Sequence, residues 1–303
     1  MNLREMIESA GHQFLAVSPA AILCCVSLLQ HSPLFVSAVA NPSIGSLAGS
    51  LTSECAKSGS RSIVIFDLRD QDGNRLVFGA WLADQISIMA DVDSSPVKIV
   101  ERSRLAKMIA DLHVSPINAL TSEVKTKVAV SLGADTYIDG SIGAFKSVIG
   151  VTLVATSTTR VSPSDSTWKV MVTGSIPVDG DVSAHLDVPL ESLRPRDGIF
   201  RAGHAGVTVP YCAWCPSPRF SVDAISPHHA GTILLDAVIS PQGDPVGLAV
   251  VRSVDAELDK QVIKAVRRWK FKPALDPDGI PITVKMPIGV KFYVDQQVDR
   301  KTN

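Results

Sequence analysis

The last hundred residues follow a sequence of local patterns that permits few folds. Residues 231–240 alternate between apolar and polar positions, and their apolar positions share one face: Ile233, Leu235, Ala237 and Ile239. The segment "PQGD" follows, with Pro and Gly where a tight turn needs them. Residues 245–253 then return as a second strand. Alternation on both sides of a short turn predicts an antiparallel hairpin with one buried face.

A helix and a third strand follow this hairpin. Asp255 is placed to cap the helix, whose apolar stripe is Leu258, Val262, Ala265 and Trp269. Acidic residues fill its first turn and basic residues its last, the order that the helix dipole favours. The segment "ITVKMPIGVKFYV" alternates again as a strand. The order β-β-α-β predicts a small antiparallel sheet covered by one helix, with Trp269 in its core.

The middle of the chain has a different pattern. Short apolar runs at 61–70 and 97–103 predict buried strands, and helical periodicity appears between and after them. Ser103 is placed to cap the second helix and Gly133 to stop the third. Three more strands are predicted before residue 180. Residues 61–180 are therefore expected to form an α/β domain with a mixed sheet and about three helices, so the predicted fold class is α+β.

The N-terminal forty residues suggest export. An apolar stretch ends at Ala38-Val39-Ala40, a form that signal peptidase accepts, and predicts cleavage between Ala40 and Asn41. The alternative is a retained membrane anchor. Either way the chain is expected in the periplasm or cell envelope, cleaved or anchored in the inner membrane. The rest of the predicted organisation is a flexible tether at 41–60, a linker at 181–204 and a tail at 295–303.

Charge and motifs argue against several functions. The formal net charge is −1 over 303 residues, so no general electrostatic attraction to nucleic acid is expected. The catalytic and phosphate-binding motifs G-x-S-x-G, G-x-x-x-x-G-K, H-E-x-x-H and G-x-G-x-x-G do not occur. Asp135 and Asp139 lie near each other on a strand without further support for acid–base chemistry. We predict a protein that is not an enzyme and uses no cofactor or metal; the competing view is a thiol oxidoreductase or a hydrolase without a visible motif.

Two cysteines in "YCAWCPSPRF" allow three readings. Cys212 and Cys215 are compatible with a metal clamp, a redox pair or a structural disulfide. A metal site needs four ligands, and the adjacent His228 and His229 lack the usual spacing. A redox pair needs a helix N-terminus, whereas prolines follow here. A disulfide in an exported chain is preferred. Cys55 is then left over, either free or linking two chains.

The C-terminal pattern resembles the TonB C-terminal domain family. The resemblance covers about residues 205–294 and depends on the motifs Pro216, Pro218-Arg219-Phe220, Gly231-Thr232, Gly243, "AVRRWKFKPA" at 265–274, Gly279-Ile280-Pro281 and Phe292. The family often has Pro-x-Tyr where this chain has Pro-Arg-Phe. Its transducers also carry a long proline-rich span, whereas the 19 prolines here are dispersed.

This resemblance implies binding of partner segments by β-strand addition. Pro287 in the last strand independently indicates an edge strand or a bulge at that position. The predicted partner-binding edge consists of Val284, Lys285, Met286, Ile288, Val290 and Phe292. The implied function is a protein-binding module of the periplasm linked to TonB-dependent outer-membrane transport. Its implied partner is an outer-membrane receptor or another envelope protein, with a homodimer as a further expectation. Nucleic acid is not expected, and a membrane only through a retained N-terminal segment.

The middle segment is similar to the N-terminal domain of the TolB, CsgG and FlgO group of exported proteins. The similarity depends on "SIVIFDL", "LADQIS", "VKIVERSRLAKMI" and "AVSLGADTYIDGSI" in that order. Members of that group serve envelope assemblies. The alternative function is therefore a structural accessory of an envelope or secretion assembly, without energy transduction.

Overall fold

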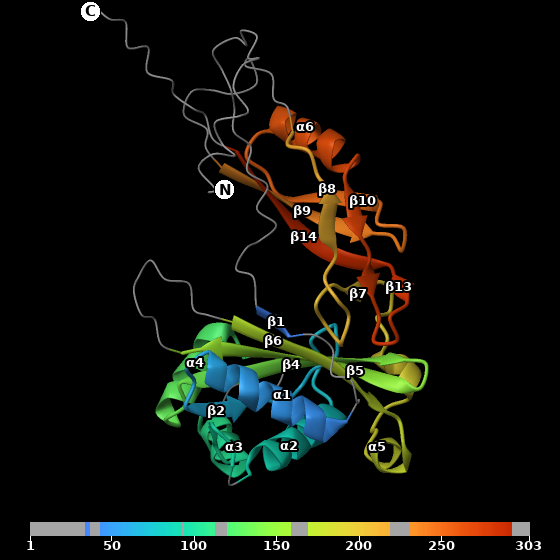
Figure 1. Cartoon of the computed structure of the whole chain (residues 1–303). Coiled ribbons are helices and arrows are strands. Elements are labelled where there is room, and N and C mark those ends of the chain that lie inside the picture. The colour runs from blue at the N-terminus through green and yellow to red at the C-terminus, as the bar shows by residue number, and fades with distance from the viewer. Residues whose placement is uncertain are drawn as a thin grey trace, which may run out of the picture.

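The structure is a computed structural model that describes residues 34–36, 43–92, 94–112, 120–158, 169–218 and 231–292. It has two main sheets with helices packed on them, which confirms the predicted α+β class. The six-stranded sheet with α1 to α4 forms the lower part of Figure 1, and the smaller C-terminal sheet with α6 stands above it.

The larger sheet is mixed, and its strands lie in the order β1-β6-β5-β4-β2-β3. Strands β4, β5 and β6 pair antiparallel, whereas β1, β2 and β3 join by parallel pairing. The bounds are β1 Leu34–Val36, β2 Ser62–Ile65, β3 Lys98–Ile99, β4 Thr136–Phe145, β5 Val148–Ser157 and β6 Lys169–Pro177. Because β1 lies within the first forty residues, cleavage after Ala40 would remove this edge strand from the sheet. Ala40 and Asn41 themselves lie outside the described residues.

Helices cover both faces of this sheet. α1 (Ile44–Lys57) and α2 (Val77–Ala90) pack on one face, in a core that contains Leu51, Leu82 and Ile138. α3 (Arg102–Asp111) and α4 (Ser122–Ser131) lie on the other face around Phe66 and Tyr137. Gly133, which adopts a positive φ of 77°, ends α4 as predicted.

The prediction of a flexible tether over 41–60 is wrong, because α1 occupies most of it. Ser43 and Ser46 form a reciprocal capping box at its start. Its buried stripe is Leu47, Ala48, Leu51, Thr52 and Cys55. The high content of Ser, Gly and Ala concealed this short stripe. Burial raises the pKa of the Cys55 thiol to about 12, so a bond between chains at Cys55 does not fit the folded state.

The predicted cap at Ser103 is also wrong. α3 begins at Arg102, with Glu101 at the cap position and no capping side chain. The Arg102 side chain instead turns into the sheet, where its Nε lies 2.6 Å from Asp84 Oδ1 and its Nη2 lies 2.6 Å from Asp67 Oδ1. Burial acts to raise the pKa of Asp67, but the adjacent guanidinium groups of Arg102 and Arg75 outweigh it and hold this pKa below its ordinary value.

We predict that replacing the Arg102 guanidinium causes a pH-dependent loss of stability. Arg102→Gln should lower the free energy of unfolding by about 1.5–3 kcal/mol at neutral pH. Because the folded-state pKa of Asp67 is depressed, the stabilisation is present above the unfolded pKa and is lost as pH falls through the folded one. The difference in the free energy of unfolding between wild type and Arg102→Gln, measured by urea unfolding, should therefore be smaller at acid pH than at neutral pH. The exposed Arg104→Gln on the same helix is the control, and a difference independent of pH would contradict this account.

The segment predicted as a linker at 181–204 is packed against the larger domain. It contains α5 (Gly180–Ala184) and a 3-10 helix at Leu190–Leu193. Both carboxylate oxygens of Asp187 accept bonds from the backbone at the start of α2, from Val77 N at 3.1 Å and Phe78 N at 3.0 Å. His185 stacks on Trp81 with ring centroids 4.3 Å apart. The linker was predicted from its polar, turn-rich composition, which does not reveal a cap supplied from a distant segment.

The C-terminal domain has the predicted β-β-α-β order. Its sheet runs β10-β9-β14-β7 and consists of β9 Gly231–Ile239, β10 Pro245–Arg252, β14 Val284–Phe292 and β7 Phe200–Arg201. α6 (Ala256–Val266) is capped by Asp255, whose Oδ1 accepts from Glu257 N and Leu258 N. Trp269 is fully buried in the core, as predicted. Two short pairs complete the domain: β8 Tyr211–Trp214 with β11 Lys270–Lys272, and β12 Ala274–Leu275 with β13 Pro281–Ile282.

The two domains touch through residues 200–207. Ala205 N donates to Ser141 Oγ at 3.0 Å, and Gly206 N donates to Thr152 Oγ1 at 2.9 Å. The rings of Phe145 and Phe200 stack with centroids 4.5 Å apart. This segment therefore covers the face of β4 and β5 that α1 and α2 leave open.

Candidate functional site

Strand β14 is the element that sequence analysis singled out as a binding edge. On one side it pairs antiparallel with β9 without interruption, from Val284 to Phe292. On the other side its pairing with β7 covers Val284 and Lys285 only. From Met286 to Val290, no strand of the described chain pairs with that second side.

The direction of the backbone groups follows from one hydrogen bond. Ala202 N donates to the carbonyl oxygen of Lys285 at 3.1 Å, so the polar groups of Lys285 face β7 and away from β9. Successive residues of a strand point their N–H and C=O groups to opposite sides, so residues 287 and 289 share this outward direction. Pro287, which has no N–H, therefore removes no hydrogen bond from the ladder with β9. This explains why the pairing with β9 continues through Pro287 without a bulge.

Most predicted edge residues turn their side chains into the core. Val284, Ile288 and Val290 are fully buried, and Met286 is 7% exposed. Lys285 is half-buried, and its Nζ lies 3.0 Å from Asp197 Oδ2. Pro287 is exposed, whereas Gly289 is buried. The side chain of Phe292 lies outside the described residues. These positions can therefore offer a partner mainly backbone groups.

The opposite edge of the sheet is β10, which sequence analysis did not single out. Val246 and Val251 on this strand are 66% and 63% exposed. Its pairing with β9 shifts register between Pro245 and Gly247 and again between Val250 and Arg252. Bulges and a proline make an edge less receptive to a further strand. The exposure of these valines is visible only in the structure, because the sequence alone shows an ordinary apolar strand.

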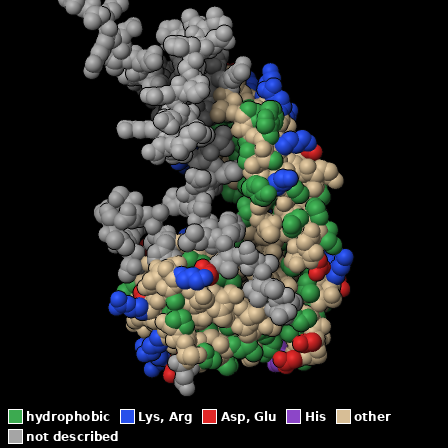
Figure 2. All heavy atoms as spheres, in the orientation of Figure 1, with side chains coloured by type: hydrophobic (Ala, Val, Ile, Leu, Met, Phe, Trp, Pro, Cys, Tyr) green, Lys and Arg blue, Asp and Glu red, His purple; other side chains and the backbone are tan. Residues whose placement is uncertain are grey.

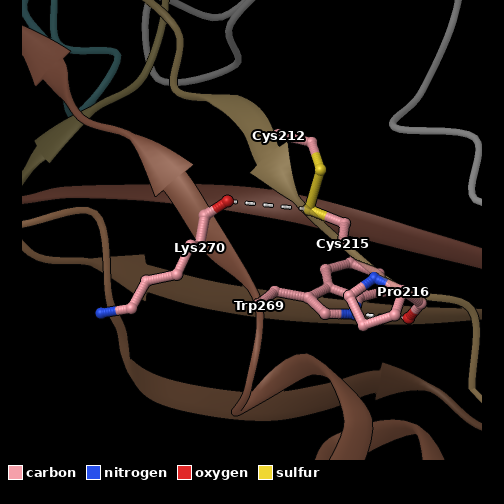
Figure 3. The surroundings of a disulfide bond; sticks show 5 residues. All are labelled: Cys212, Cys215, Pro216, Trp269 and Lys270. Atoms are coloured by element: carbon pink, nitrogen blue, oxygen red, sulfur yellow. Dashed lines mark hydrogen bonds between the residues drawn. A yellow bond between two sulfur atoms is a disulfide. The ribbon is translucent and has the colours of Figure 1, made fainter.

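Cys212 and Cys215 form a disulfide, as predicted, with their Cα atoms 5.9 Å apart. Cys215 Sγ lies 3.9 Å from the carbonyl oxygen of Lys270 (Figure 3). Trp269 Nε1 donates to the carbonyl oxygen of Pro216 at 2.9 Å, which fixes the residue after the bridge to the core. The sulfurs are bonded to each other in this state and are not available as metal ligands.

Other candidate groups have structural partners. Asp135 accepts from Ser60 Oγ at 2.7 Å and from Arg61 N at 2.8 Å, so it joins the turn before β2 to the start of β4. Asp139 pairs with the buried Lys125. No cluster of three His, Cys, Asp or Glu that could hold a metal ion occurs in the described ranges. Among the helices described, none has the length and hydropathy needed to cross a membrane.

Comparisons with known proteins give one family and three solved structures. The model of the Gram-negative bacterial TonB protein C-terminal family matches residues 216–294. The LpoB C-terminal domain from Salmonella enterica is 12% identical with a TM-score of 0.33, over 44% of this chain and 95% of that chain. The LpoB C-terminal domain from Escherichia coli is 11% identical with a TM-score of 0.32, over 42% and 96%. The solution structure of LpoB from Escherichia coli is 11% identical with a TM-score of 0.32, over 56% and 91%.

No curated protein matches the sequence. The family match lies within the predicted range of 205–294 and includes α6, Trp269 and all of β14. The match with the TonB C-terminal family model therefore confirms, over residues 216–294, the resemblance that the sequence predicted.

Proposed function

We propose that this chain is a protein-binding module of the bacterial cell envelope, which adds an extended segment of a partner protein to the outer edge of β14. The observation that carries the proposal is the contrast between the two sides of β14. Within the described part of the chain, one side is paired along its whole length, and the other is paired at two residues. Unpaired backbone groups at a sheet edge are the usual template for strand addition.

The family match supports the same proposal. The matched range contains the whole of β14, and the strand lies at the position where the resemblance predicted a binding edge. The partner in this proposal is an outer-membrane receptor or another envelope protein, and the process is TonB-dependent transport. No catalysis is part of the proposed function.

A gain of binding at Pro287 would test this mode of recognition. Pro287→Val restores an outward-facing N–H at an exposed position and leaves the β9 ladder intact, so it adds one hydrogen bond to an incoming strand. One such bond contributes about 0.5–1.5 kcal/mol, which corresponds to about twofold to tenfold tighter binding. The measurement is quantitative mass spectrometry of envelope proteins that co-purify with the full chain.

Val290→Pro provides the contrasting variant. Residue 290 faces β9, and its side chain is fully buried, so this substitution should unfold the domain rather than change its affinity. Unfolding is followed by circular dichroism. Unchanged co-purification with a folded Pro287→Val variant would count against strand addition at β14.

The second candidate is a structural accessory of an envelope or secretion assembly. It is favoured by the packed contact of residues 200–207 between the domains, which joins them into one body. The mass of the native N-terminal peptide, with membrane fractionation, separates the two candidates. A start at Asn41 in the soluble periplasmic fraction would exclude an energy transducer, whereas an intact Met1 in the inner membrane would support one.

A further inference from the structure

A second surface, which differs from the β14 edge in its chemical character, lies on the β8–β11 pair. Lys270 is the register partner of Trp214, and Lys272 is the partner of Tyr211. Directly opposed residues of an antiparallel pair project on the same face. The pairing shifts register between Lys270 and Phe271, which leaves Ala213 as an extra residue and brings Tyr211 and Trp214, three residues apart, opposite two lysines on one face. We call the four residues Tyr211, Trp214, Lys270 and Lys272 the aromatic–lysine face.

The aromatic side chains of this face are unusually exposed. Tyr211 is 61% and Trp214 is 58% exposed, whereas Phe271, on the opposite face of the same pair, is 3% exposed. The core therefore uses Phe271 and the adjacent Trp269, and leaves the other two rings in solvent. Packing among the described residues therefore does not account for a tyrosine and a tryptophan at these positions.

The surroundings of the aromatic–lysine face are basic. Lys264, Arg267 and Arg268 at the end of α6 are exposed, and the chain runs from them directly into β11. Figure 2 shows Lys and Arg side chains gathered at the level of α6. Lys270 pairs with Asp244, whereas Lys272 forms no ion pair within the described ranges. The face therefore presents net positive charge beside two amphipathic rings.

The disulfide holds this face in one conformation. It closes the four-residue loop that contains Trp214, and its Cys215 sulfur contacts the Lys270 carbonyl on the neighbouring strand (Figure 3). In Figure 3 the side chain of Lys270 extends away from the disulfide. A surface fixed in this way loses little conformational entropy when it binds.

We propose that the aromatic–lysine face docks on an anionic phospholipid surface. Trp and Tyr are enriched at the boundary between water and lipid, and adjacent lysines are attracted to anionic headgroups. Interfaces between proteins are enriched in Tyr and Trp but depleted of Lys, so it is the two lysines, rather than the rings, that favour an anionic lipid surface over a protein partner. This contact is separate from the strand addition proposed for β14 and from any N-terminal anchor.

The probe is a vesicle of one part phosphatidylglycerol to three parts phosphatidylethanolamine, with pure phosphatidylcholine as the neutral comparison. The difference between the emission spectra of wild type and Trp214→Phe, both as full chains, isolates the signal of Trp214. The anionic vesicles should shift this signal to the blue and protect it from iodide, and salt should weaken the effect. Because both chains carry the same N-terminus, membrane binding by that segment does not produce the Trp214 signal.

Charge variants test the lysines. Lys272→Gln should weaken the vesicle dependence of the Trp214 signal about fivefold, as expected for one lysine at an anionic surface. Lys107→Gln, an exposed lysine on α3, should leave it unchanged. Near-ultraviolet circular dichroism checks that each variant is folded. A Trp214 signal that stays open to iodide on anionic vesicles overturns the proposal, as does protection by polyglutamate but not by vesicles, which would indicate an acidic protein partner.

Discussion

Trp269→Ala should destabilise the C-terminal domain by about 3–5 kcal/mol. Trp269 is fully buried at the end of α6, among the side chains of β9 and β14. Its removal leaves a cavity and also frees the carbonyl of Pro216, which now accepts from the indole at 2.9 Å. Urea unfolding, followed by amide hydrogen exchange of β9 and β14, measures the loss within this domain.

The exposed Trp214 supplies the matched control. Trp214→Ala removes the same ring from a position that is 58% exposed, so it should change the free energy of unfolding by no more than about 0.5 kcal/mol. Equal losses for the two variants would contradict the assignment of Trp269 to the core. They would also show that the β8–β11 pair supports the fold through its outer face.

Gly150→Ala should disrupt the contact between the two domains. A Cβ atom at Gly150 would lie 2.0 Å from the carbonyl oxygen of Ala205, a backbone atom that can move only with its segment. Overpacking of this kind costs about 1–3 kcal/mol. We expect faster hydrogen exchange at residues 203–207 and a larger radius of gyration in solution scattering.

Gly49→Ala is the corresponding control in the same domain. Gly49 is exposed within α1, and a Cβ there meets no atom within 4 Å. This variant should be more stable by about 0.5–1 kcal/mol, because alanine favours the helix. Unchanged exchange at 203–207 in Gly150→Ala would mean that this segment does not hold the domains together.

Strong local periodicity explains which elements sequence alone could predict. The alternation in β9 and β14 and the apolar stripe of α6 each specify a buried face without reference to the rest of the chain. The disulfide could also be predicted, because its two cysteines lie close together in the sequence. By contrast, the buried stripe of α1 is short and contains only two leucines among Ala, Thr and Cys, and β7 is two residues long, so neither produces a clear periodic signal.

At the candidate site, too, local features could be predicted from the sequence and contacts between distant segments could not. Pro287 predicted an edge strand, since proline is tolerated where no ladder bond is needed. In the structure β14 lies between β9 and the short β7, and beyond Lys285 no strand of the described residues pairs with its second side. The sequence could not determine which side of the strand is open, because that depends on the Ala202–Lys285 bond formed by a segment more than eighty residues away. The Asp187 cap on α2 likewise joins residues distant in the chain and leaves no local pattern.

The most direct test of strand addition is in-cell photo-cross-linking from the edge itself. A photoreactive residue at Pro287 is compared with one at Val246 on β10, since both positions are exposed at opposite edges of one sheet. We predict an adduct from Pro287 that maps to an extended segment of an envelope protein, and none from Val246. Adducts from Val246 alone, or from neither position, would contradict the proposal that β14 receives the partner strand.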